Sequence, residues 1–222
     1  MKRELQGAYT GDRAAALSGV PKSTVHYWAR KEILIPSVSA ERVKFWSYTD
    51  LMGLRTIYWL RQPKKLQEGH QVPRTSMKAV RRALAALREL DLQPWSEEHG
   101  PTVAVDRNGE GFFTPDGGVS TAAGQRVIEG DWLDLIAPFT TEQGRGPDLY
   151  APRPSLRIIP GKLAGSPHIV KTRIETIALA ALEERGLTEG KIALLYPMAP
   201  RPAVSEALDL EHQLQRNLRA AA

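Results

Sequence analysis

The chain has 222 residues, 42% of them hydrophobic and 25% charged, with a formal net charge of +5 and no cysteine. This is the composition of an ordinary globular protein. It excludes disulfides, zinc fingers, iron–sulfur clusters and thiol nucleophiles, and no apolar run approaches the ~20 residues that span a bilayer. The N-terminus turns polar at once, so the sequence predicts no signal peptide and a cytoplasmic protein.

The positive charge is concentrated at the N-terminal end. Residues 1–62 hold 10 Lys and Arg against 5 Asp and Glu, whereas residues 101–154 hold 4 against 8. A basic segment joined to an acidic one indicates nucleic acid at one end and a different partner at the other. Solubility alone also explains a surplus of this size, so charge by itself leaves both interpretations open.

Residues 11–31 are predicted to form two short helices around a glycine turn. Asp12 favours the start of the first helix, and Gly19 ends it because glycine takes a positive φ freely. The second helix is expected over residues 22–31.

The second helix has an inner face and a free face. Val25 and Trp28 lie three residues apart on the inner face, and Ala15 with Gly19 completes the spacing of a helix-turn-helix. An ordinary helical hairpin has the same spacing, so spacing alone does not separate the two. Short polar and basic side chains on the free face are candidates for contacts with bases and phosphates in a major groove. These residues are Lys22, Ser23, Thr24, His26, Tyr27, Arg30 and Lys31.

Residues 36–46 predict a small hairpin or wing. A proline and two serines make this stretch poor for a helix, and the apolar residues Val43, Phe45 and Trp46 follow. A strong helix with one apolar stripe is expected next, over residues 49–62.

The stretch over residues 8–62 resembles the MerR-type winged helix-turn-helix. The matching pieces stand in the family's order: YT at 9–10, AAALSGVPKSTVHYW at 14–28, ILIP at 33–36 and WSYTDL at 46–51. The resemblance implies a recognition helix at 22–31, a wing near 36–46, and phosphate contacts from Tyr27, Arg42 and Tyr48. The family's long coiled coil is absent and there is no cysteine, so a metal- or drug-sensing regulator is not expected.

Residues 63–100 are expected to form a linker and then an amphipathic helix over 76–90. The helix carries an apolar stripe of Val80, Leu84 and Leu87, which is a candidate dimer surface.

Residues 101–154 change to the period of a strand. A hairpin is expected around the turn Arg107-Asn108-Gly109, and a connector rich in glycine and proline follows over residues 140–154.

Residues 155–222 are predicted to be helical, with helices over 177–184, from an N-cap at Thr188 to Leu195, and over 204–218. The C-terminal helices are the other candidate dimer surface.

This C-terminal part resembles a second family. The segments LRIIPGKLAGSPHIVKTRIET at 156–176 and IALLYP at 192–197 are similar to a domain of unknown function in VapB-type antitoxins, which pair with PIN-type ribonuclease toxins. The resemblance implies an antitoxin that neutralises such a toxin and represses its own operon.

Three arginines are candidates for contact with the toxin or a second subunit. Arg173 has a planar fork suited to a partner's carboxylate. The alternative, which the residues favour, is that Arg173 pairs internally with Glu175 or another acid while Thr172 caps the next helix. Arg216 and Arg219 are suited to an acidic toxin site, although a solvated helix end is the commoner explanation.

No pattern of catalytic or metal-binding residues stands out. The five histidines lack metal-ligand spacing, the glycine-rich runs form no phosphate-binding motif, and the acids of the middle region are scattered. We therefore expect no enzyme, no cofactor and no metal site.

The sequence predicts an α+β, mostly helical fold in four parts: 1–62 winged helix-turn-helix, 63–100 linker and helix, 101–154 small β-rich region, and 155–222 helical antitoxin domain. The predicted function is an antitoxin that binds operator DNA as a homodimer and neutralises a PIN-type toxin. The alternative is a MerR-like transcription regulator whose C-terminal domain senses a ligand.

Overall fold

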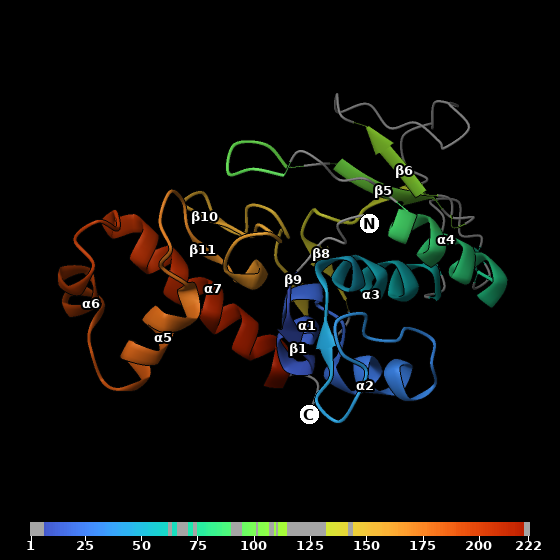
Figure 1. Cartoon of the computed structure of the whole chain (residues 1–222), viewed down its shortest axis with the longest axis horizontal. Coiled ribbons are helices and arrows are strands. Elements are labelled where there is room, and N and C mark those ends of the chain that lie inside the picture. Colours follow the sequence, from blue (N-terminus) through green and yellow to red (C-terminus); the bar gives the residue numbers. More distant parts are fainter. Residues whose placement is uncertain are drawn as a thin grey trace.

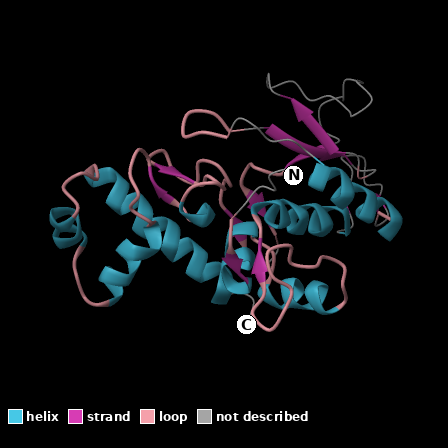
Figure 2. Cartoon of the chain, viewed as in Figure 1, coloured by secondary structure: helices cyan, strands magenta, loops and turns pink. Residues whose placement is uncertain are grey.

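The structure is a computed structural model. It describes residues 7–61, 64–65, 71–72, 75–89, 95–100, 102–106, 109, 111–114, 132–141 and 144–219. Helices dominate these residues, and the strands pair into small antiparallel sheets (Figure 2). This confirms the predicted α+β class. In the described residues, no helix is both long and apolar enough to cross a membrane.

The N-terminal head, residues 7–61, consists of three helices and a two-stranded sheet. Its elements are β1 (Tyr9–Thr10), α1 (Gly11–Ser18), α2 (Lys22–Arg30), β2 (Phe45–Trp46) and α3 (Tyr48–Arg61). Strand β1 pairs antiparallel with β2, and a further bridge between Ser39 and Phe45 closes the predicted wing into a minimal hairpin. The two helices of the predicted helix-turn-helix are confirmed.

Local capping explains the bounds of α1. The side chain of Thr10, rather than that of Asp12, caps the helix by accepting a hydrogen bond from the amide of Arg13. Gly19 ends the helix with φ +75°, as expected. A Cβ at Gly19 would lie 2.4 Å from the backbone nitrogen of Gly146, so this position needs glycine both for its φ and for a close backbone approach.

Helix α4 (Met77–Glu89) packs against α3. Val80, Leu84 and Leu87 are all buried in the chain's own core. The prediction that this stripe forms a dimer surface is therefore wrong, because α3 already covers it. The short strands β3 (Lys64–Lys65) and β4 (Gln71–Val72), which follow α3 and precede α4 in the chain, pair with each other.

The middle region contains a three-stranded antiparallel sheet. Strand β5 (Thr102–Asp106) lies between β6 (Gly111–Thr114) and β7 (Trp132–Asp134). The predicted hairpin is confirmed. Of its turn residues, Arg107 and Asn108 lie outside the described residues, whereas Gly109 has φ +80°.

The connector expected after the sheet is more ordered in structure than its composition indicates. It contains an antiparallel hairpin of β8 (Phe139–Thr140) and β9 (Arg145–Gly146), which packs on the head beside α1. The glycines allow this close approach.

The tail domain, residues 150–219, consists of a small hairpin and three helices. Its elements are β10 (Leu156–Arg157), the turn η1 (Leu163–Gly165), β11 (His168–Ile169), α5 (Thr176–Glu184), α6 (Glu189–Leu195) and α7 (Arg201–Arg219). Thr188 caps α6 as expected. Helix α7 begins before the expected start at Val204, because Pro202 fits the first turn, where its missing N–H costs nothing.

Helix α7 joins the tail domain to the head. It runs from the far end of the tail to the side of α1 (Figure 1). Val204, Leu208 and Leu210 are buried among the tail elements, and Leu214 is buried nearer the head. Toward its end, the side chain of Asn217 donates to the carbonyl of Ala16 in α1.

Candidate nucleic-acid interface

A groove of about 650 Å³ lies between α2 and the wing. Its walls are formed by Thr10, Gly11, Ser23, His26, Arg30, Arg42, Val43 and Lys44. The fold thus brings Ser23, His26 and Arg30 of the second helix together with Arg42 of the wing. Lys44 also lines the groove, although nothing in the sequence singled it out from the rest of the wing. Its ammonium lies near the carbonyls of Ala40 and Glu41.

Most of the free face of α2 is exposed, as predicted. Thr24 and Lys22 are the half-buried residues of this face, and the charge of Lys22 is paired. Ser23, His26, Arg30 and Lys31 are exposed, as are Tyr27 of the helix and Arg42 of the wing, while Thr24 is half-buried. Lys22 is half-buried, and its ammonium lies 2.8 Å from a carboxylate oxygen of Asp12. The charge of Lys22 is therefore partly balanced within the head.

His26 lies over the first turn of α1. A Cβ at Gly11 would lie 3.1 Å from Cε1 of the His26 ring, so the glycine leaves space for the imidazole. This packing aligns the histidine along one wall of the groove.

The predicted phosphate contact from Tyr48 is wrong. Its side chain is fully buried, and its hydroxyl donates to the carbonyl of Leu149 over 2.6 Å. Burial raises the pKa of the Tyr48 phenol well above its ordinary value. The ring also makes an edge-on contact with Trp95, with centroids 4.8 Å apart. Tyr48 therefore holds the head against a later segment instead of contacting a ligand.

Arg55 is the other residue of α3 whose role the sequence did not reveal. Its guanidinium is fully buried and donates to six carbonyl oxygens, those of Leu17, Ser18, Leu135, Ile136, Ala137 and Pro147. Burial lowers its pKa to about 10, which leaves it a cation at neutral pH. Two of its acceptors lie at the C-terminal end of α1, where the helix dipole favours positive charge.

The three candidate arginines of the C-terminal part are exposed, and Arg173 stands on a different segment from the other two. Arg173 stands ahead of α5 and makes no pair with Glu175, whereas Arg216 and Arg219 lie in the last turn of α7. The alternative role of Thr172 is also wrong. Its hydroxyl donates to the carbonyl of Ile169 and accepts from the amide of Ile174, so it closes a turn before the helix.

In the part of the chain that the structure describes, no three His, Asp or Glu side chains converge as a metal site. His212 instead faces Glu183, with its Nε2 2.7 Å from a carboxylate oxygen.

Comparison with known proteins agrees with this geometry for the head. Residues 9–70 match the family described as MerR HTH family regulatory protein. The head is a MerR-like helix-turn-helix. No curated protein and no solved structure gave a significant match to the chain. The family match ends at residue 70, so the antitoxin resemblance of residues 155–222 stays a prediction.

Proposed function

We propose that the protein is a DNA-binding transcription regulator that places α2 in the major groove and the wing against the adjacent backbone. The observation that carries this proposal is the groove between α2 and the wing. It joins exposed polar and basic side chains from two segments of a MerR-like head. The surplus of positive charge in residues 1–62 favours the same partner.

The exposed side chains divide into two roles. Ser23 and His26 line the groove on α2 and are assigned to base edges, whereas Tyr27 keeps its predicted role at a phosphate. Arg30, Arg42 and Lys44 are assigned to phosphates. Lys31, Lys22 and Thr24 are placed at the margin of the interface, because Lys31 follows the end of the helix and the other two are half-buried.

A regulator of this kind generally reads two half-sites as a homodimer. We propose that the protein acts in the cytoplasm, where operator DNA is found. The proposed function requires no catalytic activity and no cofactor.

The test uses the full chain and a random DNA library. Selected duplexes are measured by gel shift at several salt concentrations. We expect His26→Ala to weaken binding about tenfold and to relax preference at one base position. Arg30→Ala should weaken binding to all sequences and make the salt dependence shallower, because one fewer counterion is released. The matched control is Arg185→Ala, which removes an exposed arginine from the tail domain.

Failure to select any DNA sequence would refute the proposal. So would unchanged affinity for both His26→Ala and Arg30→Ala, because both residues line the groove on α2.

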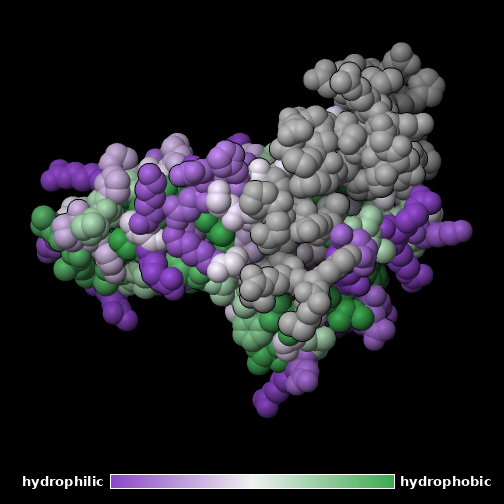
Figure 3. Space-filling view, turned by 45° about the horizontal axis from the view of Figure 1, so that its top comes forward, coloured by the Kyte–Doolittle hydropathy of each residue, from purple (hydrophilic) through white to green (hydrophobic). Residues whose placement is uncertain are grey.

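Neutralisation of a PIN-type toxin is the second candidate function, and an exposed apolar cluster in the tail domain favours it. Leu194, Leu195 and Met198, at and just beyond the end of α6, are 77, 59 and 82% exposed. Helix α6 lies at the left end of the tail in Figure 1, and hydrophobic surface is visible at that end in Figure 3. Exposed apolar groups that lie together indicate a protein contact. Co-expression with the product of the neighbouring gene tests it. Co-purification and loss of ribonuclease activity are expected, and Leu194→Ser should weaken both. This function is excluded if the product of the neighbouring gene does not bind this protein and has no ribonuclease activity.

A further inference from the structure

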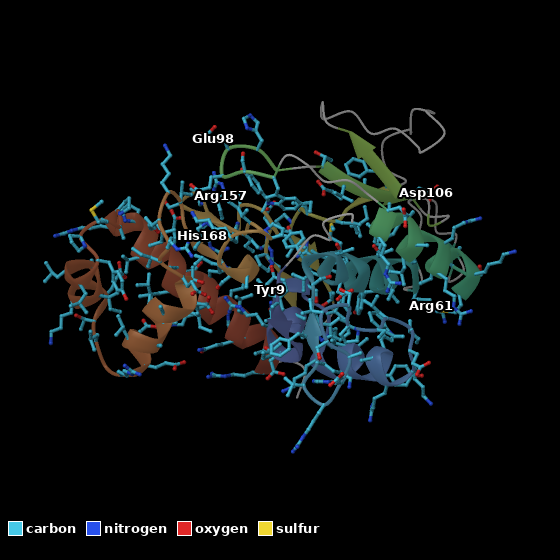
Figure 4. The ribbon with its side chains drawn as sticks, in the orientation of Figure 1. Tyr9, Arg61, Glu98, Asp106, Arg157 and His168 are labelled. Atoms are coloured by element: carbon cyan, nitrogen blue, oxygen red, sulfur yellow. The ribbon has the colours of Figure 1, made fainter. Side chains whose placement is uncertain are left out.

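A second hollow lies between the head and the tail domain. It encloses about 500 Å³, bordered by β1 and α1 on one side and by η1, α5 and α7 on the other. Figure 4 labels Tyr9, a residue of its wall, at this junction. A volume of this size suits a small organic molecule.

The walls are largely apolar. Ala16, Leu163, Ala180 and Leu214 contribute apolar surface, and Ile177 is 51% exposed although it belongs to the apolar side of α5. The small side chains of Ala180 and Ala181 on α5 do not fill the hollow. The half-exposed side chain of Ile177 offers apolar surface that a ligand can cover. A ligand with an apolar body would gain free energy by covering it.

The charged groups of the wall favour a cation. Four acids and one arginine line the hollow: Asp12, Glu175, Glu184, Glu211 and Arg13. The guanidinium of Arg13 is paired with Glu211, since its Nη1 and Nη2 lie 2.5 and 2.7 Å from the two carboxylate oxygens. Glu184 accepts from the amide of Gln215, and no hydrogen bond or ion pair engages the carboxylate of Glu175 within the described residues. The wall therefore keeps a surplus of negative charge.

We propose that this hollow binds an amphipathic organic cation, with its apolar body beside Ile177 and its charged group toward Glu175 or Glu184. An anion is disfavoured there because the only guanidinium among these wall residues is already paired. A regulatory role for this site rests on the proposed function, since a bound cation can change DNA affinity only if the head binds DNA.

Three contacts connect the hollow to the head. The hydroxyl of Tyr9 donates to the carbonyl of Gly165 over 2.8 Å, and the amide of Ala8 donates to the carbonyl of Ala164 over 2.9 Å. The third contact is the ion pair of Asp12 with Lys22 on α2. Asp12 lines the hollow, and Thr10 lines both the hollow and the DNA groove.

These contacts give a direct route from ligand to DNA. A cation held toward Glu175 or Glu184 also attracts the carboxylate of Asp12 in the same wall and so competes with Lys22 for it, which frees the lysine for a DNA phosphate. We therefore expect the ligand to change DNA affinity, and the change to depend on Asp12.

Calorimetry with three isosteric probes tests the site. The probes are 4-biphenylmethylammonium, 4-biphenylmethanol and 4-biphenylcarboxylate, each titrated into the full chain. We expect saturable binding of the cation, at least tenfold weaker binding of the alcohol, and none of the carboxylate. Glu175→Gln should reduce the preference for the cation.

Two variants that block the hollow and one matched control place the binding. Ala181→Phe fills the hollow and Ile177→Lys puts a cation into it, so each should abolish binding. Ala178→Phe adds the same ring to α5 at an exposed position outside the hollow and should bind as before. Ile177→Lys keeps the test valid if Ala181→Phe fails to fold, because the side chain of Ile177 is half exposed.

The inference is overturned if the cation does not bind, if the carboxylate binds as well, or if the blocking variants bind like the control. Gel shifts with the selected DNA test the coupling separately. We expect saturating cation to change DNA affinity at least threefold in the natural chain and not in Asp12→Asn. An unchanged affinity overturns the regulatory role. Absence of any DNA binding refutes the proposed function and leaves the calorimetric result to decide the site.

Discussion

Arg13 in α1 and Glu211 in α7 form a two-pronged ion pair across 198 residues of sequence, with nitrogen–oxygen distances of 2.5 and 2.7 Å. The side chains are only 17 and 5% exposed. Glu211 also accepts a hydrogen bond from the hydroxyl of Thr176, at the start of α5. A single carboxylate thus joins the first helix of the head to two helices of the tail domain.

Removal of this carboxylate should destabilise the protein strongly. We expect Glu211→Ala to lower the free energy of unfolding by about 3 kcal/mol, because it leaves the largely buried guanidinium of Arg13 without its partner. Urea denaturation followed by circular dichroism measures this loss.

The matched control is the exposed pair of Asp12 with Lys22, whose side chains are 51 and 43% exposed. Asp12→Ala should cost about 0.5 kcal/mol or less, because solvent screens a surface pair. Equal losses for Glu211→Ala and Asp12→Ala would show that the first pair does not join the two parts.

Arg55 should be essential to stability for a different reason. Its acceptors are six carbonyls and no carboxylate. Arg55→Met fills a similar volume but leaves several buried carbonyls without a donor, so we expect a loss of about 4 kcal/mol. Arg55→Lys should recover only part of it, because one ammonium cannot reach acceptors spread around a planar fork. A loss below about 1 kcal/mol for Arg55→Met in thermal unfolding would refute this role.

The contrast between α1 and Arg55 shows what the sequence could reveal. Gly19 and the spacing of Val25 and Trp28 are signals within one turn or two of helix, and they predicted the helix-turn-helix correctly. The partners of Arg55 and Tyr48 lie up to 92 and 101 residues away. No local pattern shows such pairings, so Tyr48 was assigned to the surface on family resemblance alone.

Substitution of Tyr48 separates the corrected role from the predicted one. Tyr48→Phe removes the hydrogen bond to Leu149, and we expect a loss of about 1 kcal/mol in stability with unchanged DNA affinity. Arg42→Ala should show the opposite pattern, because its side chain is exposed on the wing. Gel shift and urea denaturation on both variants check this. Weakened DNA binding by a fully folded Tyr48→Phe variant would support the original prediction that Tyr48 contacts a phosphate.

Acid should destabilise the tail domain through His168, which lies opposite Arg157 in the β10–β11 hairpin (Figure 4). The His168 ring is fully buried, with Nδ1 3.1 Å from the carbonyl of Ser166 and Nε2 3.6 Å from a carboxylate oxygen of Glu97. Burial, followed by the nearby charge of Lys162, lowers the pKa of His168, although the bond to Ser166 and the charge of Glu97 oppose this.

The sign of the pH effect follows from this lowered pKa. Below about pH 6.5 the unfolded chain takes up a proton at His168 that the folded chain resists, so the free energy of unfolding falls as the pH falls. Glu97 adds to the loss at lower pH. Burial raises its pKa, but hydrogen bonds from Lys162 and the amide of Lys171 outweigh this and lower it. We expect His168→Leu to flatten the decline in melting temperature between pH 7.5 and 5.5. His99→Ala, at an exposed loop position, should leave the decline unchanged, and an equal slope in His168→Leu would refute the assignment.

A glycine should stabilise the turn η1, although glycine usually weakens a helix. Leu163 and Ala164 have φ values of +51° and +50°, a region where a Cβ costs about 1 kcal/mol. Ala164→Gly removes this strain while keeping the carbonyl that accepts from Ala8. We expect a gain of about 0.5 to 1 kcal/mol, reduced by the greater entropy of the unfolded chain. Ala178→Gly, at an exposed position of α5, should instead cost about 1 kcal/mol. Opposite signs in parallel urea denaturations are the expected result, and a loss in both variants would show that the turn does not hold Ala164 in this conformation.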